Sequence, residues 1–306
     1  MIVSSMMPAV TQMIYDMGLE HMLNGITFEC PQQALQEKEV MVRCVLEDKE
    51  YTSDEINTLF SESKATGKSL YYVDEEIMHK INPSLVFTQD VCDVCQIDTE
   101  SAERSLSKLP VVPKTISITP QSLNDVFNDA ITIATAMGFP EKGEAYVLRL
   151  QDEIKNIVDV LRAGLTLSKS VMLLEWIDPL FNCGHWIPHQ IGYAGGVDLL
   201  SHPSGNSIVI DWDKIVKYNP EVLVIAPCGY NQKRTLDDMK FLEAKPEWKN
   251  LRAVQNKQVY IADFDLFTQS SAGTLVDGIK VLAKIFHPEL FTESIGLEHK
   301  YCAYFK

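Results

Sequence analysis

The sequence predicts an α/β fold in which two βα (Rossmann-like) lobes with parallel sheets are joined by one long backbone helix, with a ligand cleft between the lobes. Three observations lead to this prediction. Short apolar runs alternate with helical patterns along the 306 residues. The order of these signals in the first half returns in the second half. Between the halves, residues 140–162 keep one apolar helical face over roughly 30 Å, at about 1.5 Å per residue.

On this pattern the chain divides into an N-terminal βα lobe at 1–120, a helical linker at 121–166 that includes the backbone helix, and a C-terminal βα lobe with its tail at 167–306. The chain is too long for one small core, which also favours two domains. The last residues, from Phe291 onward, are mixed in pattern and support no prediction.

The first half opens with a strand, followed by a helix that ends at Gly18 and a short strand at 26–28. Residues 32–70 are polar and loosely patterned. We interpret them as a helix-bearing excursion across the surface, with Thr52-Ser-Asp-Glu55 as a capping box. The remaining predicted elements are a helix stopped at Asn82-Pro83, strands at 85–87 and 115–118, and a helix at 121–137.

The second half repeats this order. A strand at 171–174 opens it, and a helical segment ends in the run 192–200. The next helix stops at Asn219-Pro220, as its counterpart stops at Asn82-Pro83. The closing elements are strands at 222–225 and 258–262 and a helix at 274–286. Chance similarity between two α/β halves is the alternative, because helix–proline–strand units are common.

Composition excludes several classes of partner. The formal net charge of −15 argues against nucleic acid and against an anionic membrane surface, because both require basic patches. No apolar run approaches the ~20 residues that a membrane helix needs, so we expect no membrane insertion. We expect a small-molecule ligand as the partner.

The cysteines and the N-terminus bear on the compartment. Seven cysteines, an odd number in a long chain, fit reduced thiols better than a disulfide framework. The first eight residues lack the basic and long apolar segments of a secretory signal, so we expect a cytoplasmic protein. A chain whose leader had been removed would begin in the same way, and would be periplasmic or otherwise extracytoplasmic.

The most informative stretch is the loop at 175–188, which follows the apolar strand 171–174. It carries Glu175, Trp176, Cys183, His185 and Trp186 within a dozen residues. Ligands of open α/β sheets bind at the loops that follow the strands. The alternative is that the tryptophans are core residues and His185 is a satisfied loop histidine.

Three other loops follow strand-like runs in the same way, and we expect them to converge with this one. Aromatic faces there would grip a flat or bulky ligand, with polar groups around the rim. The predicted ligand-binding residues are Ser5, Glu29, Cys30, Asp90, Cys92, Cys95, Glu175, Trp176, Cys183, His185, Trp186, Cys228 and Tyr230.

A metal site and a catalytic site are alternatives for the same residues. Cys92 and Cys95 form a Cys-x-x-Cys and, with His185, are candidate metal ligands, but the second paired knuckle of a structural zinc site is missing from the sequence. Cys183 with His185 suggests a thiol nucleophile, although residues two apart on a loop seldom align for that chemistry. The sequence contains no P-loop, nucleophile elbow, Gly-x-Gly-x-x-Gly or His-Glu-x-x-His motif.

Motifs along nearly the whole chain resemble the cobalamin-binding branch of the class III (helical-backbone) periplasmic substrate-binding proteins, which serve vitamin and iron–siderophore importers. They are Glu29-Cys30-Pro31, Gly67-Lys-Ser-Leu-Tyr-Tyr72, Thr88-Gln-Asp-Val-Cys-Asp-Val-Cys95, Glu175-Trp-Ile-Asp-Pro-Leu-Phe181, Gly184-His-Trp-Ile-Pro188, Ala194-Gly-Gly196, Pro227-Cys-Gly229 and Leu275-Val-Asp-Gly278. The resemblance implies two lobes bridged by a rigid helix, cobalamin or a related corrinoid as ligand, and an ABC-type permease as partner.

The chain departs from the family pattern at Phe28, where histidine is common, and at Ser270-Ser-Ala-Gly273, where many members have Arg-Pro-Gly. With this resemblance, we expect a non-catalytic binding protein for a corrinoid. The first alternative is a protein that binds iron, haem, a siderophore or another transition metal through Cys and His ligands. The second is a thiol-dependent enzyme on the same fold.

Overall fold

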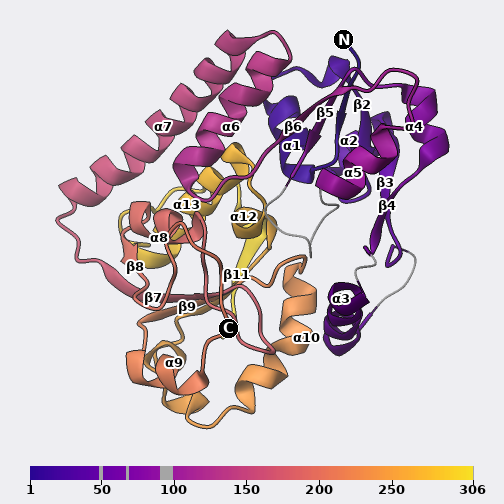
Figure 1. Ribbon diagram of the computed structural model, residues 1–306. Coiled ribbons are helices and arrows are strands. Elements are labelled where there is room, and N and C mark those ends of the chain that lie inside the picture. Colours follow the sequence, from indigo (N-terminus) through magenta and orange to yellow (C-terminus); the bar gives the residue numbers. More distant parts are fainter. Residues whose placement is uncertain (48–50, 67–68, 90–98, 306) are drawn as a thin grey trace. The chain divides into compact units, whose positions relative to one another are not determined.

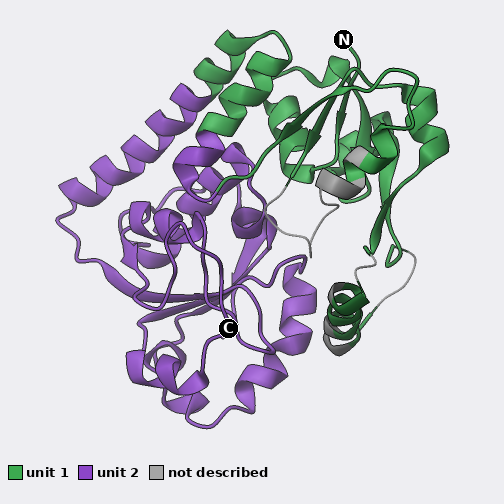
Figure 2. Ribbon diagram, in the orientation of Figure 1, with its two compact units in different colours: residues 1–120, 128–146 green, residues 121–127, 147–306 purple. Residues whose placement is uncertain are grey.

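The computed structural model describes residues 1–47, 51–66, 69–89 and 99–305 (Figure 1). The chain forms two compact units (Figure 2). Unit 1 comprises residues 1–120 and 128–146, and unit 2 comprises residues 121–127 and 147–306. Each unit is an α/β lobe built on its own sheet, so the predicted fold class is confirmed, with one correction to the sheets given below.

Unit 1 contains a six-stranded sheet in the order β4-β3-β2-β1-β5-β6. Neighbouring strands are parallel except for β3 and β4, which are antiparallel. Its strands are β1 (Val3–Ser5), β2 (Leu23–Thr27), β3 (Glu39–Cys44), β4 (Tyr71–Val73), β5 (Leu85–Thr88) and β6 (Lys114–Ser117).

Unit 2 contains a five-stranded sheet in the order β11-β10-β9-β7-β8. Only the pair β10 and β11 is antiparallel among the described strands of this sheet. Its strands are β7 (Lys169–Leu174), β8 (Gly196–Val197), β9 (Val222–Ile225), β10 (Val259–Ala262) and β11 (Tyr301–Ala303).

The prediction of purely parallel sheets is therefore wrong at one edge of each sheet, where β4 and β11 run antiparallel to their neighbours. Four of the strands were not predicted. β4 has only three residues and directly follows the polar stretch 32–70. β3 lies in the polar stretch 32–70, where Glu39 and Arg43 alternate with buried residues and weaken its apolar signal. β11 lies in the unpatterned tail, and β8 has only two residues.

Helices follow the strands in both units. Those of unit 1 are α1 (Pro8–Asp16), α2 (Gln32–Glu37), α3 (Ser53–Thr66), α4 (Glu75–Ile81) and α5 (Thr99–Leu106). Those of unit 2 are α8 (Ile187–Tyr193), α9 (Trp212–Tyr218), α10 (Gln232–Glu243), α11 (Arg252–Gln255), α12 (Asp265–Thr268) and α13 (Ala272–Phe286). The helices α6 (Leu123–Ala136) and α7 (Pro140–Ala163) run from one unit into the other, and α7 is the predicted backbone helix.

The predicted helix ends are confirmed where local chemistry fixes them. Asn82 and Asn219 each follow a helix in the left-handed conformation, with φ of 48° and 50°. Each donates its backbone N–H to the carbonyl four residues earlier and is followed by proline, which cannot continue the helix. At the start of α3, Thr52 and Glu55 exchange hydrogen bonds as a capping box.

The helical segment predicted to end in 192–200 is shorter than expected. α8 ends at Tyr193, because Gly195 takes a left-handed φ of 82° and Gly196 enters the strand β8. A side chain at Gly196 would collide with Phe286 and Ile191. Close packing of β8 against the core therefore replaces the expected last turn.

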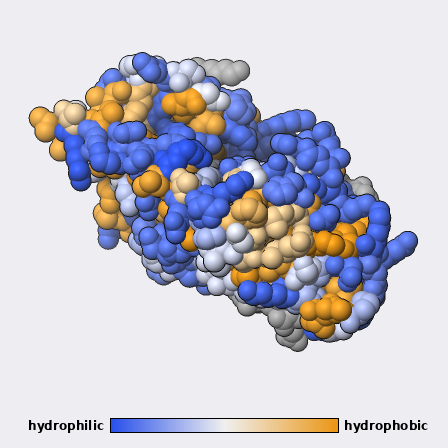
Figure 3. Space-filling view, turned by 90° about the horizontal axis from the view of Figure 1, so that it is seen from above, coloured by the Kyte–Doolittle hydropathy of each residue, from blue (hydrophilic) through white to orange (hydrophobic). Residues whose placement is uncertain are grey.

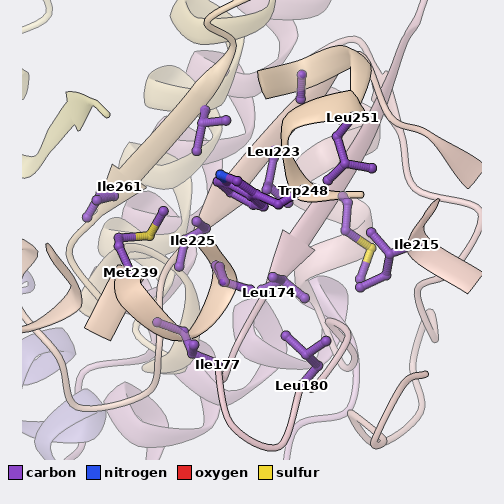
Figure 4. Close-up of a cluster of buried hydrophobic side chains, with 14 of the residues drawn as sticks. Leu174, Ile177, Leu180, Ile215, Leu223, Ile225, Met239, Trp248, Leu251 and Ile261 are labelled. Atoms are coloured by element: carbon purple, nitrogen blue, oxygen red, sulfur yellow. The ribbon is translucent and has the colours of Figure 1, made fainter. Parts of the chain in front are cut away.

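Buried apolar side chains from the strands and helices form the core of unit 2 (Figure 4). Leu174, Leu223 and Ile225 come from β7 and β9, and Trp248 and Met239 cover them. The rows of buried residues on β7 and β9 match the continuous apolar runs by which the strands were predicted. Packing of the strands thus fixes where their carboxyl ends, and the loops that follow, lie within this unit.

The surface face in Figure 3 is largely hydrophilic and carries separate apolar patches. Of the helices that the structure describes, none combines the length and the apolar character needed to span a bilayer.

Candidate functional site

In unit 2, the loops that follow three neighbouring strands are hydrogen-bonded to one another. The carbonyl of Glu175, after β7, accepts the backbone N–H of Cys228, after β9, at 3.0 Å. The carbonyl of Tyr230 accepts the N–H of Phe264, after β10, at 3.2 Å. Within this unit the structure therefore brings Glu175, Cys228 and Tyr230 together at the carboxyl edge of the sheet, as parallel strands require.

Glu175 fastens the loops around it. One carboxylate oxygen accepts the N–H of Gly184 at 3.0 Å, and the other accepts the hydroxyl of Ser207 at 2.6 Å. Burial raises the pKa of this carboxyl, and the two hydrogen bonds oppose the rise. Glu175 is thus a partly buried anchor between the loops at 182–186 and 204–208.

Asn182 adds a second connection between these segments. Its amide nitrogen donates to the carbonyl of Leu200 at 2.6 Å, and its amide oxygen accepts the N–H of Ile208 at 2.7 Å. The backbone N–H of Asn182 also donates to Ile208 O at 3.1 Å. A side chain at the neighbouring Gly184 would meet the backbone of Gly205 and Ser207 at 2.4 Å and 2.5 Å, so glycine is required for this close approach.

His185 projects from the loop that these contacts hold. Its backbone is in the left-handed region, with φ of 51°. Its N–H donates to Gly205 O at 2.6 Å, and its own carbonyl accepts the N–H of Ser204 at 2.9 Å. The half-buried ring lies beside the ring of Trp186, with centroids 5.4 Å apart, and its Nδ1 is 3.3 Å from Oε1 of Gln121. Burial lowers the pKa of His185, which favours the neutral imidazole.

Trp176 and Tyr230 form the aromatic part of the site. Their ring centroids are 4.9 Å apart at an interplanar angle of 60°. Tyr230 is only 3% exposed, and the Arg234 guanidinium lies 4.0 Å from its ring centroid. Trp176 is half-buried and donates its indole N–H to Asp178 O at 3.0 Å. Of the two rings, Trp176 has more surface available to a ligand.

Trp186 is placed differently from Trp176. It is 6% exposed, and its indole N–H donates to the carbonyl of Phe267 at 2.6 Å. It packs under the loop and beside His185, so its position suits support of the loop rather than stacking on a ligand.

Cys183 is completely buried, and its thiol donates to the Asp198 carboxylate at 3.6 Å. Burial, and then the negative charges of Asp198 and Glu175, raise the pKa of this thiol well above its usual value. A reactive thiolate needs a lowered pKa and access to substrate. The structure therefore places Cys183 as a structural thiol, which speaks against the nucleophile suggested by its proximity to His185.

The predicted site residues of unit 1 are less connected. Ser5 follows β1, and its hydroxyl donates to Met7 O and accepts from Met7 N, which closes a local turn. Cys30 is buried and donates its thiol to Thr11 Oγ1 at 3.2 Å, and burial raises its pKa to about 11. Glu29 keeps solvent contact, yet crowding by the protein, with added repulsion from Glu47, raises its pKa to about 7.

The predicted residues Asp90, Cys92 and Cys95 lie outside the described residues. Among the cysteines that the structure describes, Cys30, Cys44, Cys183 and Cys228 are free thiols. Within the described ranges, no three His, Cys, Asp or Glu side chains gather closely enough to hold a metal ion. His185, the described member of the predicted metal set, therefore has no described cluster of metal ligands around it.

A surface groove of about 460 Å³ lies elsewhere in unit 2, at the end of α7 and beside α8. Its lining includes Leu161, Arg162, Leu165 and Tyr193. None of the described residues that we predicted for the site lines it, so the groove is distinct from the strand-end cluster.

Three residues that support the site were missed by the sequence analysis. Ser207 and Gln121 reach Glu175 and His185 from segments 32 and 64 residues away. Asp198 accepts the N–H groups of Leu173 and Leu200 as well as the Cys183 thiol. Gln121 lies beside the start of a helix, where a polar residue is usually interpreted as part of the helix cap. The spacing of residues along the sequence does not predict its contact with His185.

Solved structures with the same fold are similar over almost their whole length. An ABC transporter substrate-binding protein from Listeria monocytogenes EGD-e is 14% identical with a TM-score of 0.69, over 94% of this chain and 98% of that chain. The periplasmic heme-binding protein RhuT from Roseiflexus sp. RS-1, in apo form, is 16% identical with a TM-score of 0.67, over 94% and 98%. The periplasmic vitamin B12 binding protein BtuF of Vibrio cholerae is 14% identical with a TM-score of 0.62, over 95% and 98%.

At these identities the likeness to the solved structures shows the fold alone. Comparison of the sequence with curated proteins finds no match. The sequence profile of one family, described as Periplasmic binding protein, matches residues 47–266, which is most of the chain. The family name favours the extracytoplasmic alternative over the cytoplasmic setting expected from the sequence. The chain belongs to this periplasmic binding protein family.

Proposed function

We propose that the protein is a non-catalytic binding protein for a corrinoid, cobalamin or a close relative, and that it delivers this ligand to an ABC-type permease. The observation that carries the proposal is the cluster at the strand ends of unit 2, where Trp176 and Tyr230 lie 4.9 Å apart. Family membership supports the binding role.

The chemistry of the cluster fits binding better than catalysis. Glu175 has both oxygens engaged by Gly184 and Ser207, an arrangement that suits a structural anchor better than a general acid or base. Cys183 is buried with a raised pKa, which removes the thiol nucleophile that the enzyme alternative needs. What remains available is an aromatic surface on Trp176 and the imidazole of His185, and a flat macrocycle can use both.

A haem is the second candidate, and one observation favours it. The half-buried His185 is neutral because burial lowers its pKa, and a neutral imidazole is a good ligand for haem iron. RhuT, a fold relative, is named as a heme-binding protein. The two candidates share the site and differ in the macrocycle that it accepts.

The test is an absorbance titration of the purified protein with hydroxocobalamin, cyanocobalamin and ferric haem, followed by the Trp176→Ala variant. We expect saturable binding of the corrinoids at micromolar concentration or below, weakened at least about tenfold by Trp176→Ala, since base–aromatic and similar stacking contacts contribute about 1–3 kcal/mol each. Trp176 is the sharper target than Trp186, whose removal would also disturb the loop.

The matched control is Trp212→Phe, because Trp212 lies on α9, is also half-buried, and also donates its indole N–H to a backbone carbonyl, that of Pro246. We expect this variant to bind as the unmodified protein does. Absence of binding by both cobalamins, with tight haem binding, would replace the corrinoid with haem. Absence of binding by all three probes would refute the proposed ligand class.

A further inference from the structure

His185 is held in one orientation by contacts on both sides of its backbone. Its N–H and carbonyl bond to Gly205 and Ser204, and the preceding N–H, of Gly184, bonds to the Glu175 carboxylate. A non-glycine residue in the left-handed region is strained, and such strain persists only where its surroundings enforce it. These hydrogen bonds therefore hold the backbone of His185 in a strained conformation, and this sets the position from which its imidazole projects.

Gln121 fixes which ring nitrogen carries the proton. Its side-chain carbonyl Oε1 lies 3.3 Å from Nδ1 of His185, and a carbonyl can only accept. Nδ1 therefore carries the hydrogen and donates it, which leaves the lone pair on Nε2. Gln121 is itself held at the start of α6, where its backbone N–H donates to the Asp125 carboxylate at 3.1 Å.

Nε2 of His185 forms no hydrogen bond with any residue in the part of the chain that the structure describes. In metal sites, a ligating imidazole almost always donates its other ring N–H to an oxygen acceptor, which sets the tautomer and the ring direction. The pair of His185 and Gln121 reproduces this arrangement before any metal is present.

A metal held in a macrocycle needs fewer ligands from the protein than a bare ion does. A bare ion needs several protein ligands, and no group of three His, Cys, Asp or Glu side chains gathers within the described residues. A metal that already carries four donors from a macrocycle needs only one ligand from the protein. The ring of Trp186 beside His185 also limits the directions in which the imidazole can turn.

We propose that His185 coordinates the metal of the bound macrocycle through Nε2, and that Gln121 is the positioning residue that directs it. This inference rests on the proposed function and deepens it. On binding, the Nε2 lone pair replaces a water on one axial face of the metal, and that water leaves. No electron is transferred, and the Nδ1 proton stays in its hydrogen bond with Gln121.

The test is electron paramagnetic resonance of the protein with cob(II)inamide, a corrinoid that lacks its own axial base. We expect each cobalt line to split into three, from one ¹⁴N ligand, and into two when the protein is labelled with ¹⁵N-histidine. The splitting should be lost in His185→Ala. In the control variant His189→Ala, four residues further along, the splitting should be unchanged.

Gln121 is tested by two substitutions of similar size. Gln121→Leu removes the acceptor, and we expect cob(II)inamide to bind about tenfold more weakly, since loss of such supporting partners typically costs 10–100-fold in metal affinity. Gln121→Glu keeps an acceptor and should restore both affinity and splitting. Equal affinities for the Leu and Glu variants would show that Gln121 has no positioning role.

A parallel experiment uses ferric haem, whose visible spectrum changes when a histidine ligand is lost. Comparing the two probes shows whether the protein binds an iron macrocycle or a cobalt one. Binding of either probe without a nitrogen signature from His185 would overturn this inference and leave the proposed function standing. Splitting that survives His185→Ala would do the same. Failure of cob(II)inamide, the cobalamins and haem to bind would overturn the proposed function as well.

Discussion

The two lobes share a fold plan but differ in how polar groups are held at their strand ends. In unit 2, both oxygens of Glu175 bond to neighbouring loops, to Gly184 and to Ser207. In unit 1, the Glu29 carboxylate has no hydrogen bond to any residue that the structure describes, and its pKa rises to about 7 through crowding and the charge of Glu47. The Glu175 carboxylate is a structural anchor, whereas the Glu29 carboxylate makes no hydrogen bond with the described residues.

This difference between Glu175 and Glu29 bears on the stability of the loops that carry them. Burying a carboxylate is costly, and the cost is offset only when its lone pairs find donors. The loop that carries His185 has that compensation, so it is rigid before a ligand arrives. The Glu29 loop carries a carboxyl whose pKa is raised to about 7, so its protonation state can change near neutral pH.

The largest effect is expected from Glu175→Ala, which leaves the N–H of Gly184 and the hydroxyl of Ser207 without their acceptor. We expect unfolding of unit 2 to become easier by about 3 kcal/mol, because each buried group left unpaired costs about 1–3 kcal/mol. All four tryptophans lie in unit 2, so urea unfolding followed by tryptophan fluorescence measures this directly.

The matched substitution is Glu29→Ala, followed by circular dichroism because unit 1 contains no tryptophan. We expect the free energy of unfolding to change by less than about 0.5 kcal/mol, since substitutions away from buried networks usually have small effects. Equal losses of stability in the two variants would remove the contrast between the lobes.

The next effect concerns the two tryptophans of the site loop. Trp186→Phe leaves the buried carbonyl of Phe267 without its donor and a space where the larger ring was, so we expect a loss of about 2 kcal/mol. Trp176→Phe should cost less than about 1 kcal/mol, because Trp176 is partly exposed and can be solvated. Thermal unfolding of both variants measures the difference, and a larger loss for Trp176→Phe would reverse the assigned roles.

Asp198 gives a pH dependence confined to unit 2. Burial raises its pKa from 3.8 to about 6, against the hydrogen bonds from Leu173 and Leu200. The folded state therefore binds the proton more tightly than the unfolded state. The stability that this proton contributes is fully present below about pH 4 and is lost as the pH rises through about 6.

Between pH 5 and pH 7, the unmodified protein should lose about 1 kcal/mol of stability relative to Asp198→Asn, which does not titrate. Urea unfolding at several pH values, followed by fluorescence, gives the two slopes. Asp211→Asn, at an exposed position, is the control and should follow the unmodified protein. Parallel curves for the unmodified protein and Asp198→Asn would show that Asp198 does not titrate in this range.

The smallest effect separates the two Asn-Pro helix ends. Asn219 accepts the backbone N–H of Arg252 at 2.7 Å through its side chain, whereas no side-chain hydrogen bond joins Asn82 to a described residue. Asn219→Gly should therefore cost about 1 kcal/mol, and Asn82→Gly should be neutral within about 0.5 kcal/mol, since glycine adopts the left-handed conformation freely. Equal costs at the two positions would contradict this distinction.

The sequence predicted those elements whose signals are local. Asn-Pro stops, apolar strands such as 222–225 and the long helix at 140–162 are fixed by neighbouring residues, and the structure confirms them. The strands β3, β4, β8 and β11 were missed because partial exposure dilutes their apolar pattern or because they are very short, and all of them except β3 lie at the edge of a sheet. Edge pairing depends on what lies beside a strand, which sequence periodicity does not describe.

The sequence predicted which residues lie near the site better than it predicted what each of them does there. The stretch at 175–188 was identified from its position after a strand, and its members do gather in unit 2. Their roles required long-range contacts: Ser207 makes Glu175 an anchor, Asp198 makes Cys183 structural, and Phe267 makes Trp186 a support. No spacing rule connects such pairs, because folding alone brings them together.

Calorimetry measures directly whether this family member holds a corrinoid. Hydroxocobalamin and ferric haem are titrated separately into the unmodified protein, and each is then titrated into protein saturated with the other. The account predicts saturable heat with hydroxocobalamin, tighter binding than haem, and competition between the two for one site. No heat with hydroxocobalamin, or binding of haem that cobalamin cannot displace, would contradict it.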